Sequence, residues 1–166
     1  LVMACEHCIR FKVLTYPNIP MGMLSPAKRV FEVLYVDFMY MKPVVWHRSK
    51  NGTRVYKYIL TMVDQFSFMT FAFPTTNMEH TTFIKHLDDL RRSMDKFNWK
   101  IGKVISDNQT SLIPNRQVQE YLERHGIEYK TTFPYVSRNN LAEIGNRLIR
   151  NVLRTLHKNN LNQWPF

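Results

Sequence analysis

Hydrophobic residues form one continuous early run and then recur in patterns typical of strands. The run FEVLYVDFM, residues 31–39, is apolar and rich in β-forming residues, as expected of a strand buried on both faces. Asn51-Gly52 is a strong hairpin signal between VVWHRS and TRVYKYILTMV, so two long antiparallel strands should meet there. A turn at Asp64-Gln65 leads into FSFMTFAF, which is expected to end at Pro74. The first half is therefore predicted to be a three-stranded meander.

The second half of the chain alternates helical and strand patterns. Thr76 and Glu79 have the spacing of a capping box, and a helix with one apolar face is expected to follow them. The apolar positions of that helix are Phe83, Ile84, Leu87, Leu90, Met94 and Phe97. KVISD predicts a short strand, Gln117 to His125 a helix, and IEYKTTF another strand. Strands followed by this alternation predict an α/β domain whose mixed sheet is covered by helices.

The last predicted helix, NNLAEIGNRLIRNVLRTL, has an ordinary apolar face and an unusual polar one. A helical wheel places on the apolar face Leu141, Ile144, Leu148, Val152 and Leu156. The opposite face carries Glu143, Arg147, Arg150 and Arg154. A purely local interpretation is available, in which Asn140 caps the helix and Glu143 pairs with Arg147. Glu143 alone therefore does not establish any chemistry.

Composition narrows the class of protein and its partners. The 166 residues are 45% hydrophobic, enough to bury one core. A net charge of +10 and a pI near 9.8 favour a polyanionic partner, most commonly nucleic acid, with membrane surfaces and acidic proteins as alternatives. No apolar run reaches the roughly 18 residues of a membrane span, and no secretory leader is recognisable. We expect an intracellular, unsecreted domain, and the start at Leu1 suggests a piece of a longer polypeptide.

Two aspartates on predicted strands are candidates for chemistry. Asp37 lies inside VLYVDFM, where a buried carboxylate must be neutral, paired or bound to a metal unless it faces solvent at the strand end. Asp107 follows KVIS at the edge where α/β proteins place their sites, although Asp-Asn is also a common turn. If the last helix packs across both strands, Glu143 joins them. Converging carboxylates repel unless cations intervene, and their hard oxygens suit Mg²⁺ or Mn²⁺ in a two-metal phosphoryl-transfer site.

These three segments resemble one known family. VLYVDF, VISDN and NNLAEIGNRLIR, with 35 residues between Asp107 and Glu143, resemble the Asp, Asp, Glu catalytic core of retroviral and retrotransposon integrases. The resemblance covers about residues 30–158 and includes YILTMVDQFSFMTFAFP. It implies an RNase H-like fold, a five-stranded mixed sheet flanked by helices with Asp37 on the central strand.

The resemblance also implies an activity. Asp37, Asp107 and Glu143 would be catalytic residues and the ligands of two Mg²⁺ or Mn²⁺ ions, which activate first a water and then a DNA 3′-hydroxyl. The reaction would be metal-dependent DNA end processing and strand transfer by a polynucleotidyl transferase. Its partners would be the element's DNA ends and target DNA, with a homo-oligomer in the full protein and no membrane. It would act in the nucleus or, before that, in a cytoplasmic particle.

Further residues match the family less specifically. Arg147 and Arg150 fall where the family places basic residues that touch DNA, and a solvated face is their alternative. Asn146 matches the pattern without a readable role. Asp64 matches a recurrent aspartate, for which a structural role at the turn is expected. Six aromatic residues are expected in the sheet core rather than in a base-stacking platform: Tyr56, Tyr58, Phe66, Phe68, Phe71 and Phe73.

The amino-terminal CEHC resembles the last two ligands of the His-His-Cys-Cys zinc domain that precedes such cores. Its histidines would lie before Leu1, so Cys5 and Cys8 would be a remnant, and Zn²⁺ is expected only in the complete parent protein. Two free cysteines describe this chain equally well. The expected organisation is a zinc-domain remnant over 1–12, a linker over 13–30 and a C-terminally truncated catalytic core over 31–166.

Two other functions stay open. Asn140 stands where the family commonly has glycine, which fits a host-adopted or inactive integrase-like domain that binds nucleic acid or protein. Another RNase H-like nuclease is a third interpretation, against which the CxxC remnant and the spacing to Glu143 argue. Retention of all three carboxylates favours the active integrase core.

Overall fold

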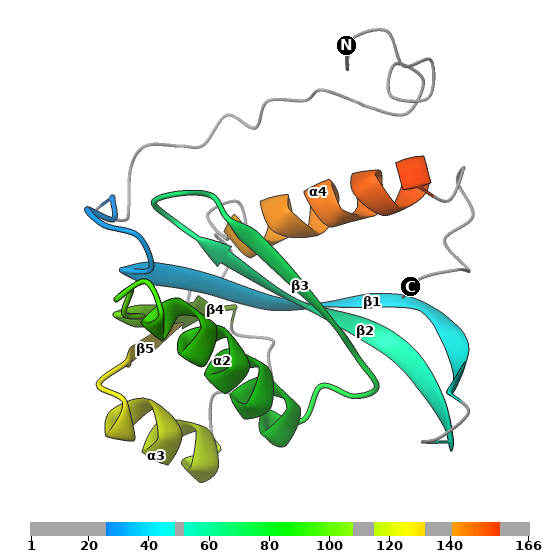
Figure 1. Ribbon diagram of the computed structural model, residues 1–166, viewed down its shortest axis with the longest axis horizontal. Helices are drawn as coiled ribbons and strands as arrows, with labels where there is room; N and C mark the ends of the chain where they lie inside the picture. The colour runs from blue at the N-terminus through cyan, green and yellow to red at the C-terminus, as the bar shows by residue number, and fades with distance from the viewer. Residues whose placement is uncertain (1–25, 49–51, 108–114, 132–140, 157–166) are drawn as a thin grey trace, which may run out of the picture.

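The computed structural model describes residues 26–48, 52–107, 115–131 and 141–156 (Figure 1). Its elements are, in chain order, β1 (Val33–Arg48), β2 (Gly52–Asp64), β3 (Thr70–Thr75), α2 (His80–Asp95), β4 (Lys103–Ser106), α3 (Arg116–Arg124), β5 (Glu128–Thr131) and α4 (Leu141–Leu156). The strands form one sheet in the order β3-β2-β1-β4-β5, with β1 in the centre. β2 and β3 run antiparallel to their neighbours, whereas β4 and β5 are parallel to β1. The predicted five-stranded mixed sheet flanked by helices is confirmed.

The predicted hairpin of β1 and β2 is confirmed, although its turn at Asn51 lies outside the described residues. The ladder is irregular between Tyr40 and Val44, where Pro43 cannot donate a backbone hydrogen bond. β3 begins at Thr70, later than expected, and continues through Pro74 to Thr75. Proline is tolerated there because β3 is an edge strand of the sheet.

The turn between β2 and β3 is organised by Asp64, which is fully buried. Its Oδ1 accepts the backbone N–H of Phe31 at 2.9 Å, and its Oδ2 accepts the N–H and hydroxyl of Ser67 at 2.8 and 2.6 Å. This arrangement supports the structural role expected of Asp64. Phe66 and Phe68 lie in the turn and are 50% and 56% exposed, so their assignment to the core was wrong. The remaining aromatic positions are at least partly buried: Tyr56, Tyr58, Phe71 and Phe73.

Helices α2 and α3 lie on one face of the sheet over the larger core cluster (Figure 1). Phe83, Leu87 and Leu90 of α2 are buried there, as the apolar pattern predicted. The predicted capping box was wrong, because Glu79 makes no side-chain capping bond. Asn77 Oδ1 instead accepts the backbone N–H of Glu79 at 3.3 Å. Phe97, assigned to the apolar face, lies beyond the end of α2 and is 60% exposed.

Helix α4 lies on the opposite face, across β1 and β2 (Figure 1). Its buried residues are Leu141, Ala142, Gly145 and Leu153. Leu148 and Val152 are 51% and 48% exposed, so the predicted apolar face was wrong in this part. The closest approach of the helix to the sheet is at Gly145, which has no side chain. The predicted cap Asn140 and the side chain of Leu156 lie outside the described residues.

The helices of the described ranges are too short or too polar for one of them to cross a membrane.

Candidate active site

Strand alternation places Asp37 on the face of the sheet that α4 covers. Leu34 and Val36 of β1 belong to the core beneath α2, whereas Tyr35 and Met39 belong to the two clusters on the α4 side. Because successive side chains point to opposite faces, Asp37 shares the face of Tyr35 and Met39. Asp37 is therefore an acidic residue within an otherwise apolar row under α4.

Strand register aligns two further polar residues with Asp37. Thr61 of β2 is its direct antiparallel partner, on the same face of the sheet. On the other side, the parallel pairing of β1 with β4 ends at Val36 and Ser106, and Asp107 follows. Ile105 belongs to a cluster on the α4 side of the sheet. Asp107 is two residues further along, so strand alternation assigns it to the same face. Thr61, Asp37 and Asp107 thus form a row across three adjacent strands.

Helix α4 is linked to this row through Asn146. The Asn146 Nδ2 donates to Asp37 Oδ2 at 2.7 Å, and the Thr61 hydroxyl donates to Asn146 Oδ1 at 2.5 Å. Glu143 lies in the first turn of α4, one turn before Asn146. The structure therefore places all three predicted carboxylates around one region, with Asp37 and Asp107 on the sheet and Glu143 on the helix above it.

Gly145 allows this close contact between helix and sheet. A Cβ built at Gly145 would lie 2.5 Å from Val63 Cγ2, 3.0 Å from Thr61 Cγ2 and 3.3 Å from Thr70 Cγ2. The first of these distances is shorter than real Cβ contacts, so a larger residue would displace the helix or the strand. Gly145 therefore sets how near Glu143 and Asn146 come to Asp37.

The carboxylates interact electrostatically. Burial, the charge of Asp107 and, to a smaller extent, the charge of Glu143 together raise the pKa of Asp37 to about 6. Hydrogen bonds from Asn146 and from the backbone of Phe38 oppose these effects. Burial and the charge of Asp107 also raise the pKa of Glu143, while Arg147 lowers it. Each carboxylate therefore lies within the electrostatic reach of another.

The donor chemistry of the three carboxylates fits a divalent cation, because hard oxygen ligands suit Mg²⁺ and Mn²⁺ and a cation would relieve their repulsion. Their spacing fits less closely. Over the described residues, no three His, Cys, Asp or Glu side chains are grouped tightly enough to hold a metal ion. Asp37, Asp107 and Glu143 therefore face a common region without forming a closed ligand set.

A sequence model of the integrase core domain matches residues 27–137, more than half of the chain. The chain belongs to the integrase core domain family. The matched range includes Asp37 and Asp107, while Glu143 lies beyond it. A search of curated protein sequences gives no match.

The solved structures similar to this integrase core include a chain from the cryo-EM structure of the simian T-cell lymphotropic virus intasome in complex with PP2A regulatory subunit B56 gamma. The TM-score is 0.66 and the sequence identity 16%, with 98% of this chain and 52% of that chain covered. At this identity the likeness concerns the fold, and the predicted RNase H-like fold is confirmed. The integrase core described here spans about half the length of that chain.

The arginines of α4 lie along the exposed side of this integrase core. Arg147 is exposed and near enough to Glu143 to lower the pKa of that carboxylate. Arg150 is also exposed. Its Nε donates to Met39 Sδ at 3.0 Å, and this contact holds the Arg150 side chain over β1. Arg154 is exposed in the last turn. The predicted zinc remnant, Cys5 and Cys8, lies outside the described residues.

Sequence reasoning missed two residues that shape the site of the integrase core, Thr61 and Gly145. Both carry a signal in the sequence. Thr61 is the one hydroxyl within the apolar run ILTMV, and Gly145 interrupts an amphipathic helix in AEIGNR. A polar residue in a buried strand and a glycine within a helix each indicate a specific contact. Neither signal identifies the partner of that contact.

Proposed function

We propose that this chain is the catalytic core of a retroelement integrase, with Asp37, Asp107 and Glu143 as its catalytic residues. The proposed reaction is DNA end processing followed by strand transfer. Membership of the integrase core family supports the reaction class. The observation that carries the site assignment is the row on the sheet: Asp37 lies on the central strand, at the same level as Asp107, and α4 brings Glu143 over both.

The three carboxylates would hold two Mg²⁺ or Mn²⁺ ions, whose chemistry is to activate the attacking oxygen and stabilise charge on the phosphate. Asn146 holds the Asp37 carboxylate through Oδ2. The backbone N–H of Phe38 adds a second hydrogen bond to the same carboxylate. The carboxylate of Asp37 is thus oriented by the protein before any ion binds.

The DNA substrate would lie along α4. Arg147 and Arg150 are one and two turns beyond Glu143, so their guanidinium groups can reach phosphates that flank a reacting phosphodiester. The net charge of +10 favours the same polyanionic partner. We further propose that the complete parent carries the zinc domain to which Cys5 and Cys8 belong, assembles as a homo-oligomer, and acts on chromosomal DNA in the nucleus.

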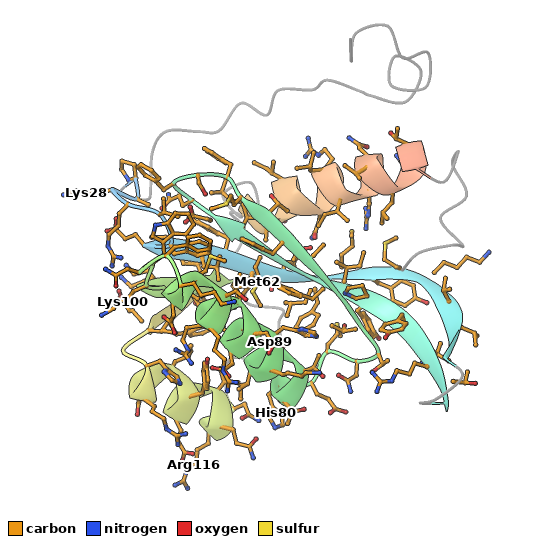
Figure 2. All side chains as sticks on the ribbon, viewed as in Figure 1. Lys28, Met62, His80, Asp89, Lys100 and Arg116 are labelled. Atoms are coloured by element: carbon orange, nitrogen blue, oxygen red, sulfur yellow. The ribbon has the colours of Figure 1, made fainter. Side chains whose placement is uncertain are left out.

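Strand transfer by the complete parent protein tests the proposal. Asp107→Asn should reduce joining of DNA ends with Mg²⁺ or Mn²⁺ to background and leave DNA binding intact. Asp89→Asn is the matched control, because Asp89 is an exposed acid on α2, away from α4 (Figure 2). Normal joining by the Asp107→Asn protein would refute the assignment.

A second candidate function is an integrase-like domain that binds nucleic acid without catalysis. Asn140, which stands where the family commonly has glycine, favours it. Such a domain would bind DNA equally with and without Mg²⁺, and its wild-type parent would join no ends under conditions in which it is folded. This alternative would be excluded if the wild-type parent joined DNA ends and the Asp107→Asn variant did not.

A further inference from the structure

Thr61 places a hydroxyl inside an apolar part of the sheet. The residue is fully buried, and its neighbours on the same strand face, Ile59 and Val63, are buried hydrophobic residues. A buried hydroxyl is costly unless it forms a hydrogen bond. Thr61 Oγ1 forms one with Asn146 Oδ1, 85 residues away in the sequence. The hydroxyl therefore serves a contact with α4 rather than the packing of β2.

The carboxylate of Asp37 and the hydroxyl of Thr61 together hold the two ends of the Asn146 amide. A carboxylate only accepts hydrogen bonds, so it is stabilised by the amide nitrogen and repelled by the amide oxygen. The amide nitrogen therefore faces Asp37 Oδ2 at 2.7 Å, and the Thr61 hydroxyl anchors the other end of the amide by donating to its oxygen at 2.5 Å. Without the bond from Thr61 the amide oxygen would lose its anchor, and the amide could rotate away from the carboxylate.

The geometry of the sheet makes this contact a closed unit. Thr61 and Asp37 are direct partners in the β1–β2 ladder, and Asn146 bridges them from the helix above. Gly145 brings the helix close enough for the bridge, since its missing Cβ would lie 3.0 Å from Thr61 Cγ2. Residues of β2 and α4 thus determine the orientation of a carboxylate on β1.

We infer that Thr61 is a positioning residue of the proposed site. By donating to Asn146, it keeps the amide nitrogen on Asp37 and holds that carboxylate in the orientation in which it meets a divalent cation. The role in cation binding rests on the proposed function. The contact between the three side chains does not, so it can be tested without metal.

The metal-free test is NMR spectroscopy of the Asn146 side-chain amide in the full chain. Thr61→Val should shift this signal and speed its hydrogen exchange at least tenfold, because the amide oxygen loses its donor, whereas Thr61→Ser should keep the wild-type signal. Thr70→Val is the matched control. Thr70 also packs near Gly145, at 3.3 Å from the built Cβ, but its hydroxyl donates to Phe68 O instead. An unchanged Asn146 signal in Thr61→Val would overturn the inference.

The substitution of a buried residue can also disturb folding, so thermal unfolding is measured for each variant. If Thr61→Val does not fold, Thr61→Ser and Thr61→Ala provide the same comparison, because they differ only in the hydroxyl. Retention of the Asn146 signal in Thr61→Ser and its shift in Thr61→Ala supports the inference. The same signal in both would refute it.

The role toward the cation is tested by calorimetric titration with Mn²⁺. Thr61→Val should weaken Mn²⁺ binding by about 10–100-fold, the usual effect of removing a group that orients a metal ligand. In an Asn146→Ala background the same substitution should have no further effect, because Thr61 acts through Asn146. If Thr61→Val reduced the Mn²⁺ affinity equally in the wild-type and the Asn146→Ala backgrounds, Thr61 would not act through Asn146.

The outcomes separate the two hypotheses. If the wild-type protein bound Mn²⁺ and Thr61→Val bound it with the same affinity, the inference would be refuted and the proposed function would stand. A wild-type protein that binds no Mn²⁺ would refute the metal site, and the NMR comparison would then decide whether Thr61 orients Asn146.

Discussion

Replacing Gly145 with alanine would add a methyl group at the closest contact between α4 and the sheet. The added carbon would lie 2.5 Å from Val63 Cγ2, whereas ordinary carbon contacts are roughly 3.5–4.0 Å. The helix would therefore have to withdraw by about 1 Å. Overpacking of this kind costs about 1–3 kcal/mol, and the better helix propensity of alanine offsets about 1 kcal/mol of it. We expect a net loss of about 1–2 kcal/mol in the free energy of unfolding.

The effect on strand transfer should exceed the effect on stability. Withdrawal of α4 moves Glu143 and Asn146 away from Asp37, and a 1 Å misplacement of catalytic groups can reduce a rate by about 10²-fold. Urea denaturation of this chain and strand transfer by the parent protein measure the two effects. The additional substitution Val63→Ala removes the clashing methyl groups and should recover part of the joining activity. Gly145→Ala with higher stability and normal joining would refute the described helix contact.

Three further predictions concern charge and the buried turn. Because burial and the charge of Asp107 raise the pKa of Asp37 to about 6, the folded state holds this proton more tightly than the unfolded state, and stability should fall as pH rises from about 4 to 6. Asp37→Asn should abolish that fall and raise the free energy of unfolding at pH 7.5 by about 1–2 kcal/mol. A pH profile of the denaturation midpoint that the substitution leaves unchanged would contradict this. Asp64→Asn should destabilise the fold by about 2–3 kcal/mol in the same assay, since a buried acceptor of three hydrogen bonds becomes in part a donor, and a loss below about 0.5 kcal/mol would argue against its role in the turn. Arg147→Ala and Arg150→Ala should each lower the salt dependence of DNA binding by about one unit of slope. Arg116→Ala, on α3 away from α4 (Figure 2), should leave that slope unchanged, and an equal effect of all three would indicate only a loss of net charge.

The sequence predicts the strands well because their apolar runs and turn signals are local. The run at 31–39 identifies the central strand, and Asn51-Gly52 identifies the hairpin that joins it to β2. Local signals fail where several residues can fill one role. Asn77, rather than Thr76 with Glu79, accepts the hydrogen bond at the start of α2, and sequence spacing does not rank these choices.

The orientation of α4 shows a different limit. A helical wheel ranks faces by hydrophobicity, and it therefore assigned Leu148 and Val152 to the buried side. The structure buries Gly145 and Ala142 instead, because small residues permit a closer approach to β2. Hydrophobicity alone does not include this steric term.

The sequence offers the three acids of the candidate site but not the contacts that support them. Asp37, Asp107 and Glu143 were singled out by the order and spacing of the family's motifs, and Asp107 also by its place at the end of a strand. The contact from Thr61 to Asn146 depends on the register of β1 with β2 and on the height of α4 above them. Both are tertiary quantities that one sequence does not contain.

The position of Asp37 at the boundary between the antiparallel and parallel parts of the sheet has a consequence for biosynthesis. Its partner Thr61 comes from an adjacent hairpin, so that half of the row can form as soon as β2 has left the ribosome. Asp107 is added only after the crossover through α2, and Glu143 only with the final described helix. The three carboxylates can therefore meet only when the domain is almost fully synthesised, and nascent chains that stop earlier carry an incomplete site.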